Sequence, residues 1–235
     1  MIQTRQVDAG RGVGWIGDGF RNFASNPGLW IVMAIIVVVI FVVLNVIPVV
    51  GFLVASLLGP VLGGGMLYAA REAHAQRPLE VGHLFQGFKD NRALNGLLAL
   101  GGITIAGTIA SVLVCFLLLG STFMAILQGA QGMPMAGFGV GALIGLLLVL
   151  VVQFAVAAAV LYAVPLVMFK GAPVGDAMSA SINACMVDFL PLLVFGVLYL
   201  LIAIVASVPF MLGWLVLLPA SVGMLYASYR DIFGD

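Results

Sequence analysis

Charged residues are scarce in this chain. Asp, Glu, Lys and Arg together make up 8% of its 235 residues, and nine basic and nine acidic side chains cancel to a net charge of zero. A soluble domain carries about a quarter charged residues. The scarcity excludes an ordinary soluble fold, and the lack of a basic excess provides no electrostatic attraction for nucleic acid.

Cysteine and histidine are also rare, with two of each. Cys115 lies within an apolar run and Cys185 outside one, so no disulfide is expected. His74 and His83 are nine residues apart, whereas two zinc ligands on one helix face need a spacing of about four. The chain has no Gly-rich phosphate loop in a strand–helix context. The sequence therefore predicts no catalytic, cofactor or metal site and does not indicate an enzyme.

Long apolar runs without charge are abundant instead. Hydrophobic residues make up 63% of the sequence, and the mean hydropathy is +1.25. A run of about 20 such residues crosses the roughly 30 Å hydrocarbon core as a helix, because a helix satisfies its own backbone hydrogen bonds. Six such runs are predicted to span the membrane: residues 29–47, 49–70, 94–119, 138–169, 189–208 and 210–229. The fourth is longer than needed, and a kink is expected before Pro165.

The nine basic residues all fall on one side of this six-span topology. The loops between spans one and two, three and four, and five and six contain no Lys or Arg. By the positive-inside rule, both termini and the two longer charged loops are cytoplasmic. No signal peptide is visible in the polar, glycine-rich start of the chain. We therefore predict a single transmembrane domain, residues 1–235, with residues 1–28 as a cytoplasmic amphipathic N-terminus.

Two of the apolar runs share a pattern that indicates an internal repeat. The pentapeptide GMLYA occurs at residues 65–69 and again at residues 223–227. In both places a proline precedes it, and a basic and an acidic residue follow it. The run between them fits more loosely, through Tyr162 and Pro165. We predict an all-α polytopic membrane helix bundle of three repeated hairpins, related by an axis along the membrane normal.

Each predicted hairpin is preceded by an amphipathic cytoplasmic segment. The clearest has Val81, Leu84, Phe85 and Phe88 at helical spacing, opposite polar side chains. Such a stripe is typical of a helix at the membrane interface. Looser stripes precede the other two hairpins, and glycines weaken the first of them. These stripes comprise Val13, Ile16, Phe20 and Phe23, and Val174, Met178, Ile182 and Cys185.

Small residues recur at every fourth position of the second span, at Gly51, Ala55, Gly59 and Gly63. Such a stripe lets a neighbouring helix approach closely. Helix packing within the bundle is therefore its expected role, and a dimer face or a substrate path is the alternative.

Ionisable side chains are missing from the interior of every predicted span. Gln153 is the most deeply placed amide, and Asn45 and Thr104 are further polar groups. Hydrogen bonds within or between helices are their expected role, and the lining of a cavity is the alternative. Asp188, at the start of the fifth span, is expected to cap that helix.

Several short motifs resemble those of a known group of proteins. They are Trp15, NPGLW at residues 26–30, NVIP at residues 45–48 with Gly51, Pro60, and LFQGF at residues 84–88. With these motifs the chain resembles a bacterial family of uncharacterised six-span membrane proteins and, more distantly, the membrane domain of glycerophosphoryl diester phosphodiesterases. The resemblance implies a multi-pass protein of the bacterial inner (plasma) membrane. It brings no catalytic residues, and phosphodiesterase activity is not implied because no soluble phosphodiesterase domain is visible.

Two functions are consistent with this sequence. The amphipathic and charged surfaces lie on the cytoplasmic side, which favours a non-enzymatic membrane protein that binds a protein partner or lipids through its interfacial helices. The alternative is a channel or facilitator for a small or amphiphilic solute, lined by Gln153, Asn45 and Thr104. The expected partners are the lipid bilayer and either another membrane protein or a second copy of the chain.

Overall fold

The structure is a computed structural model that describes residue 2, residues 4–127 and residues 135–234. Within this part the chain is helical, with nine α-helices, one 3₁₀-helix and no strand. Five segments are long and apolar enough to cross a membrane. They are Pro27–Asn45, Val50–His74, Asn91–Leu117, Leu143–Lys170 and Phe189–Ser207. The predicted all-helical membrane architecture is confirmed at this level.

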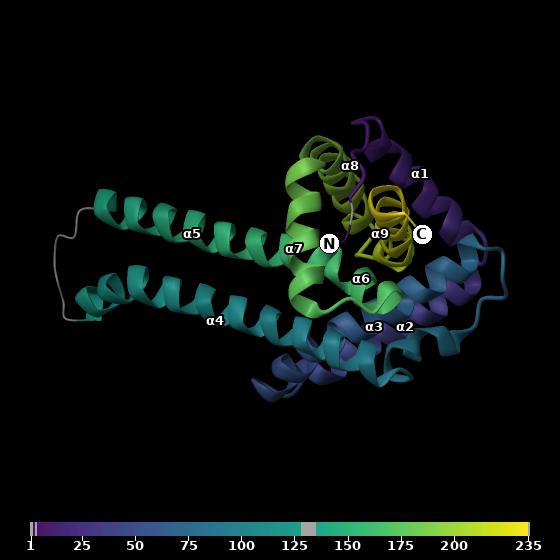
Figure 1. Ribbon diagram of the computed structural model, residues 1–235. Helices are drawn as coiled ribbons and strands as arrows, with labels where there is room; N and C mark the ends of the chain where they lie inside the picture. Colours follow the sequence, from purple (N-terminus) through teal and green to yellow (C-terminus); the bar gives the residue numbers. More distant parts are fainter. Residues whose placement is uncertain (1, 3, 128–134, 235) are drawn as a thin grey trace.

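The helices follow one another in three groups (Figure 1). In the first, α1 (Arg11–Ala24) precedes the hairpin of α2 (Pro27–Asn45) and α3 (Val50–His74). In the second, the 3₁₀-helix η1 (Val81–Phe88) precedes α4 (Asn91–Leu127), α5 (Met135–Leu161) and α6 (Ala163–Lys170). In the third, α7 (Val174–Val187) precedes α8 (Phe189–Ser207) and α9 (Trp214–Phe233).

The sixth predicted span, residues 210–229, corresponds to α9, which is not among the five apolar segments. This helix begins later than expected, at Trp214, and its last turns contain Arg230 and Asp231. More than half of its residues are buried, including Pro219 inside the helix. Because its surface is covered by other helices, α9 needs fewer apolar side chains than a helix that faces lipid.

Proline positions explain where the first span begins and where the fourth span is interrupted. Pro27 occupies the first turn of α2, where its missing N–H leaves no hydrogen bond unmade, and the Asn26 side chain caps that turn by accepting from the Leu29 amide at 3.3 Å. The fourth predicted span is interrupted at Tyr162, between α5 and α6. Pro165 follows in the first turn of α6, so the predicted break before this proline is confirmed.

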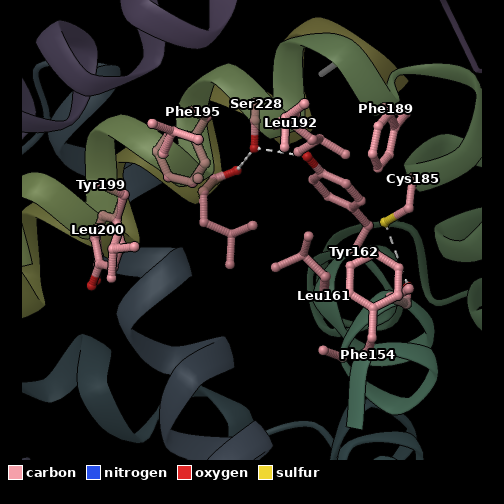
Figure 2. Close-up of a pocket in the computed structure, with 17 residues that line it drawn as sticks. Phe154, Leu161, Tyr162, Cys185, Phe189, Leu192, Phe195, Tyr199, Leu200 and Ser228 are labelled. Atoms are coloured by element: carbon pink, nitrogen blue, oxygen red, sulfur yellow. Dashed lines mark hydrogen bonds between the residues drawn. The ribbon is translucent and has the colours of Figure 1, made fainter. Parts of the chain in front are cut away.

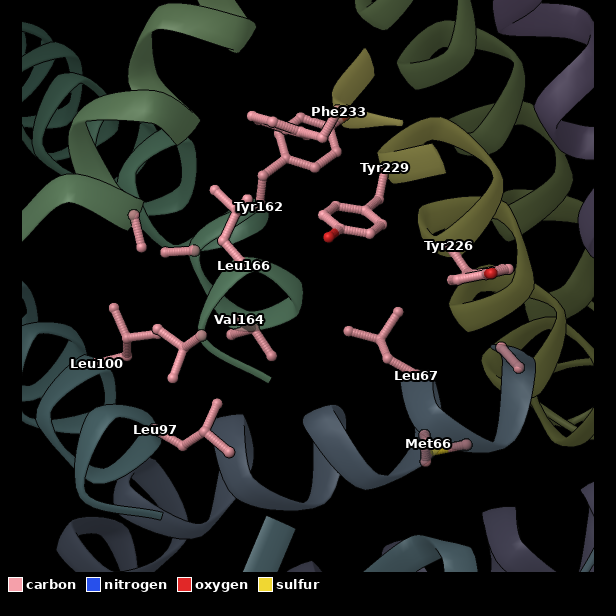
Figure 3. Close-up of a cluster of buried hydrophobic side chains, with 14 of the residues drawn as sticks. Met66, Leu67, Leu97, Leu100, Tyr162, Val164, Leu166, Tyr226, Tyr229 and Phe233 are labelled. Carbon is pink, nitrogen blue, oxygen red and sulfur yellow. The ribbon is translucent and has the colours of Figure 1, made fainter. Parts of the chain in front are cut away.

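The hydrophobic core lies at one end of the molecule. Figure 3 shows Leu67 of α3, Leu166 of α6 and Tyr229 of α9 arranged around a common centre. The aromatic side chains of Trp15 and Trp30 are fully buried in the same core. We call this region the packed end; it consists of α1, η1, α6, α7, the N-terminal halves of α2 and α4 and the C-terminal halves of α3 and α9.

Two of the three amphipathic segments pack against the end of the preceding hairpin. η1 packs on α3, and α7 packs on α5 and α6. α1 has no preceding hairpin, and it packs on α9 and α8 of the third group instead. The backbone N–H of Arg5 also donates to the carbonyl of Ile232, at 2.7 Å. The contacts therefore form a closed ring in which the N-terminal helix joins the third hairpin to the first.

The helices on which the amphipathic segments pack share the tripeptide Leu-Tyr-Ala. It lies at residues 67–69 in α3, at residues 161–163 across the break between α5 and α6, and at residues 225–227 in α9. Gly65, just before the first copy, lies so close to η1 that a Cβ atom there would overlap the Leu84 carbonyl. Gly223 has the same place in α9, and a Cβ atom there would lie 3.1 Å from the Cα atom of Gly19 in α1. In α5 the corresponding residue is Ala159, which is also buried.

The buried faces of the amphipathic segments differ from their apolar stripes, which are expected at the membrane interface. In α1 the buried residues are Gly12, Trp15 and Gly19, whereas Val13 is exposed. A Cβ atom at Gly19 would lie 2.6 Å from the carbonyl oxygen of Ala220. Gly12 and Gly19, two of the four glycines that weaken the amphipathic stripe in the sequence, are therefore residues through which α1 approaches the bundle.

η1 is a 3₁₀-helix and not the α-helix on which its predicted stripe was based. With three residues per turn, positions three apart lie on one face. Leu84 and Gly87 are accordingly buried, whereas Phe85 and Phe88 are exposed.

In α7 the buried face is also made of small residues. It consists of Ala177, Ala180, Ser181, Ala184 and Cys185, whereas Ile182 is exposed. The predicted stripe of larger side chains is therefore rotated away from the bundle, and only Cys185 belongs to both sets.

The hairpins diverge as they leave the packed end, and the hairpin of α4 and α5 projects alone (Figure 1). The turns of the first and third hairpins are built alike. Val49 and Met211 both have positive φ angles, of 63° and 62°. Two residues later, Gly51 packs on the backbone of Leu44 and Gly213 packs on that of Ala206, seven residues earlier in each case. The turn between α4 and α5 lies outside the described residues.

Candidate functional site

An apolar cleft of about 580 Å³ lies between α5, α8 and α9 (Figure 2). It exists because α5 and α8 diverge from the packed end and leave the space between them unfilled. Its walls are formed mainly by apolar side chains, including Phe154, Leu161, Leu192, Phe195, Leu200 and Leu225. Ligand pockets of roughly 300–1,000 Å³ with apolar walls and a few polar groups are the usual sites for small molecules. The cleft therefore has the size and lining of a binding site for an apolar group.

Three of the polar side chains that line the cleft come from different helices and lie on one side of it. The Tyr162 hydroxyl, at the break between α5 and α6, donates to Ser228 Oγ of α9 at 3.2 Å. Ser228 in turn donates to the Leu225 carbonyl at 2.9 Å. Cys185 of α7 lies on the same side, with its sulfur 3.8 Å from the carbonyl oxygen of Ala158 (Figure 2). These groups give the cleft a polar corner next to the packed end.

The helix break at Tyr162 is stabilised by α7. The Tyr162 backbone N–H donates to Ser181 Oγ at 3.0 Å, and the Ser181 hydroxyl donates to the Ala158 carbonyl at 2.6 Å. One serine thus satisfies two backbone groups at the end of α5. This arrangement fixes the direction in which the Tyr162 ring enters the cleft.

Asp188 lies immediately before α8 and is 1% exposed. It occupies the N-cap position of α8 as predicted, but its side chain makes no capping hydrogen bond: its Oδ1 atom accepts the backbone N–H of Val7, at 2.9 Å, from the N-terminal segment. Its Oδ2 atom is buried and has no hydrogen-bond partner among the described residues. Burial raises the pKa of the Asp188 carboxyl, and the Val7 hydrogen bond partly opposes this rise.

Cys185 lies one helical turn before Asp188 in the sequence. Burial raises the pKa of the Cys185 thiol to about 11, and the negative charge of Asp188 adds to the rise. Since the thiolate is the reactive form, this cysteine stays a neutral thiol near pH 7. The group therefore contributes a weakly polar surface to the cleft.

The predicted cavity residues Gln153, Asn45 and Thr104 do not meet. The Gln153 amide nitrogen lies 3.3 Å from Ser111 Oγ on α4. Asn45 donates to the Phe41 carbonyl of its own helix, at 2.7 Å, and Thr104 donates likewise to Leu100, at 3.2 Å. None of the three lines the apolar cleft. Their hydrogen bonds follow the expected role, within or between helices, and not the alternative of a cavity lining.

The predicted small-residue stripe of α3 divides into two parts. Gly51 and Ala55 are buried, whereas Gly59 and Gly63 are half-buried. A Cβ atom at Gly59 would touch only Phe41, at 4.0 Å, and one at Gly63 would meet nothing within 4 Å. Apart from Gly51, which packs on Leu44 at the turn, the close approaches of α3 use glycines on another face, Gly64 against Leu97 and Gly65 against the backbone of η1.

In the sequence, Tyr162 stands out only as part of a loose repeat, and Ser228 does not stand out. A signal for both exists in the sequence, because Ser228 directly follows the third Leu-Tyr-Ala and Tyr162 is the centre of the second. The sequence does not show that these two copies face each other, because that depends on how the hairpins are arranged around the core.

No known family profile matches this chain, and no solved structure matches it. A probable inner membrane protein of Burkholderia thailandensis is 27% identical over 269 aligned positions, which cover 99% of this chain and 94% of that protein. The similarity extends over nearly the whole length of both proteins. Together with the five apolar segments, it supports an integral protein of the inner membrane.

Proposed function

We propose that this protein is a non-enzymatic inner-membrane protein that binds an amphiphilic lipid in the cleft between its second and third hairpins. The observation that carries the proposal is the cleft itself, an apolar space of about 580 Å³ between helices that face the bilayer. An acyl chain fits the apolar walls, because burying it there costs no polar desolvation. The polar corner at Tyr162 and Ser228 would accept the headgroup side of the lipid.

The position of the cleft on the membrane follows from a six-span topology, in which α9 is the sixth crossing. The basic residues on which the orientation of this topology depends belong to the packed end or to the segments next to it. Examples are Arg21 of α1, Arg71 of α3 and Arg230 of α9. By the positive-inside rule, the packed end then faces the cytoplasm together with both termini. The polar corner would lie near the cytoplasmic interface and the apolar walls deeper in the bilayer.

The three groups of helices are proposed to be copies of one unit. Three observations support this: the shared Leu-Tyr-Ala, the like-built turns at Gly51 and Gly213, and the ring of contacts made by the amphipathic segments. The units differ in length, because fourteen residues separate Gly51 from Gly65 but only ten separate Gly213 from Gly223.

The amphipathic segments have a second role in this proposal. Their small-residue faces are already used inside the bundle, which leaves Val13, Phe85, Phe88 and Ile182 exposed. These side chains would lie in the interfacial layer of the membrane and hold the packed end at that depth. Binding of a partner through these segments would have to use this outer face. A channel lined by Gln153, Asn45 and Thr104 receives no support from their positions.

The cleft can be tested with a phospholipid that carries a photoactivatable group on one acyl chain. In the full-length protein, we expect crosslinks to concentrate on residues 154–161 and 189–200. Gly196 lines the cleft, and a Cβ atom there would meet nothing within 4 Å, so Gly196→Trp should fill the space without disturbing the fold. This variant should lose most of the crosslinking to these two segments.

Gly102→Trp is the matched control. Gly102 also lies in a membrane-spanning helix with open space around its Cα atom, but it is not part of the cleft. Crosslinking should be unchanged in this variant. Uniform labelling of all lipid-facing helices, or equal labelling in wild type and Gly196→Trp, would contradict the proposal.

A further inference from the structure

A second cavity, of about 410 Å³, lies at the packed end where α1, the end of α3 and α9 meet. This cavity is separate from the apolar cleft and shares no lining residue with it. Its walls include two guanidinium groups, Arg21 and Arg230, one carboxylate, Asp18, and the imidazole of His74. The charges that line it therefore sum to one net positive charge before any protonation of His74.

The only carboxylate of this lining is already neutralised. Asp18 accepts hydrogen bonds from both Arg21 and Arg11, the latter at 3.2 Å. Arg11 also pairs with Asp231 at 2.6 Å. An anion that enters the cavity thus meets a carboxylate that two guanidinium groups already share, and repulsion from Asp18 is small.

The two arginines that line the cavity differ in how firmly they are held. The Arg230 side chain is 28% exposed, and its Nη1 atom lies 3.2 Å from His74 Nδ1. The Arg21 side chain is 80% exposed and can turn toward a ligand. A held guanidinium opposite a movable one suits a planar or tetrahedral oxyanion, because arginine donates paired hydrogen bonds to such groups.

The two guanidinium groups favour a doubly charged anion over a singly charged one. A phosphate monoester is largely dianionic near neutral pH because its second pKa is about 6, whereas a carboxylate carries one negative charge. Each arginine can donate hydrogen bonds to a charged oxygen of such a group. Asn22 also belongs to the lining, but its side-chain nitrogen donates to the Ala70 carbonyl at 2.8 Å and its Oδ1 atom is buried, so it presents no acceptor to the ligand.

From these observations we infer that this cavity binds a phosphate monoester group, with Arg230 and Arg21 on its negative oxygens. The group can belong to a free phosphate compound or to the headgroup of a lipid such as phosphatidic acid. Both sources present the same chemistry to the cavity, which adjoins the segments that lie near the membrane interface.

The test uses the full-length protein in detergent, titrated with inorganic phosphate and with acetate by calorimetry. The same protein is then placed in phosphatidylcholine vesicles with and without phosphatidic acid, and retained lipid is measured after re-extraction. We expect saturable binding of phosphate or selective retention of phosphatidic acid, and no binding of acetate. Phosphate binding indicates a soluble ligand, whereas retention of phosphatidic acid alone indicates a lipid headgroup.

Arg230→Gln should weaken this binding by about tenfold or more, and Arg21→Gln by a smaller factor. Arg21→Gln tests the inference even if Arg230→Gln fails to fold, because the exposed Arg21 side chain contributes little to stability. Arg92→Gln is the control, since Arg92 is an exposed arginine that does not line the cavity. Absence of binding to both phosphate and phosphatidic acid, equal binding of acetate, or equal loss in Arg92→Gln would overturn the inference.

Discussion

The packed end and the far ends of the hairpins are held together in different ways. At the packed end, backbones approach through glycines, aromatic side chains are fully buried, and polar side chains bridge helices. At the far ends, Phe210 is 96% exposed and Phe116 is 71% exposed, and the hairpins have separated. In lipid, exposed apolar side chains cost little, because lipid tails are as apolar as they are. One end of the bundle can therefore specify the fold, while the other end stays open for lipid.

The largest expected effect compares two aromatic side chains. Trp15 is fully buried at the packed end, and its indole N–H donates to Asp231 at 2.9 Å. Trp15→Ala should lower the free energy of unfolding by about 3–5 kcal/mol, because it leaves a cavity and removes that hydrogen bond. Phe116→Ala, at an exposed far position on α4, should be close to neutral. Thermal unfolding in detergent, followed by circular dichroism, measures both; equal effects would contradict the comparison.

A sharper test within one helix uses two glycines of α3. At Gly65 a Cβ atom would overlap the Leu84 carbonyl, so Gly65→Ala should destabilise the protein by about 1–3 kcal/mol. At Gly63 a Cβ atom would meet nothing, so Gly63→Ala should stabilise the helix by about 0.5–1 kcal/mol. The same unfolding measurement should therefore give opposite signs for changes two residues apart. A shared sign would show that η1 does not approach α3 as described.

The polar corner of the cleft should contribute less. Tyr162→Phe removes the hydrogen bond to Ser228, while Ser228 keeps its bond to the Leu225 carbonyl. We expect a loss of about 0.5–1.5 kcal/mol in unfolding free energy. Tyr68→Phe is the control at the matching position of α3, where the ring packs against His83. If the two changes have equal effects, the hydrogen bond between Tyr162 and Ser228 does not stabilise the arrangement of helices around the cleft.

The smallest effect concerns the pH dependence of stability. Because burial raises the pKa of Asp188 in the folded protein, the folded state binds its proton more tightly than the unfolded state. Asp188 therefore makes stability fall as the pH rises from the ordinary carboxyl pKa through the raised one. Asp188→Asn should remove this part of the slope. Unfolding of wild type and variant across acidic pH measures the difference, and a variant whose stability falls more with rising pH than that of wild type would contradict this sign.

The sequence alone determined the membrane class, the apolar runs, and the positions where Pro27 begins a helix and Pro165 follows a break. These features depend on local rules: the length needed to cross a bilayer and the geometry of proline. The repeated GMLYA was also visible in the sequence, and both copies lie at helix contacts of the packed end.

Only the tertiary structure decided which faces are buried and where the cleft lies. The apolar stripes of the amphipathic segments predicted a place at the membrane interface and did not show which face contacts the bundle. Large side chains of these stripes, such as Val13, Phe85 and Ile182, are exposed, while glycine and alanine form many of the contacts. The pairing of Tyr162 with Ser228 and of Asp188 with Val7 joins residues 66 and 181 positions apart. Such pairs depend on how the hairpins close into a ring, because neither partner carries a local signal that specifies the other.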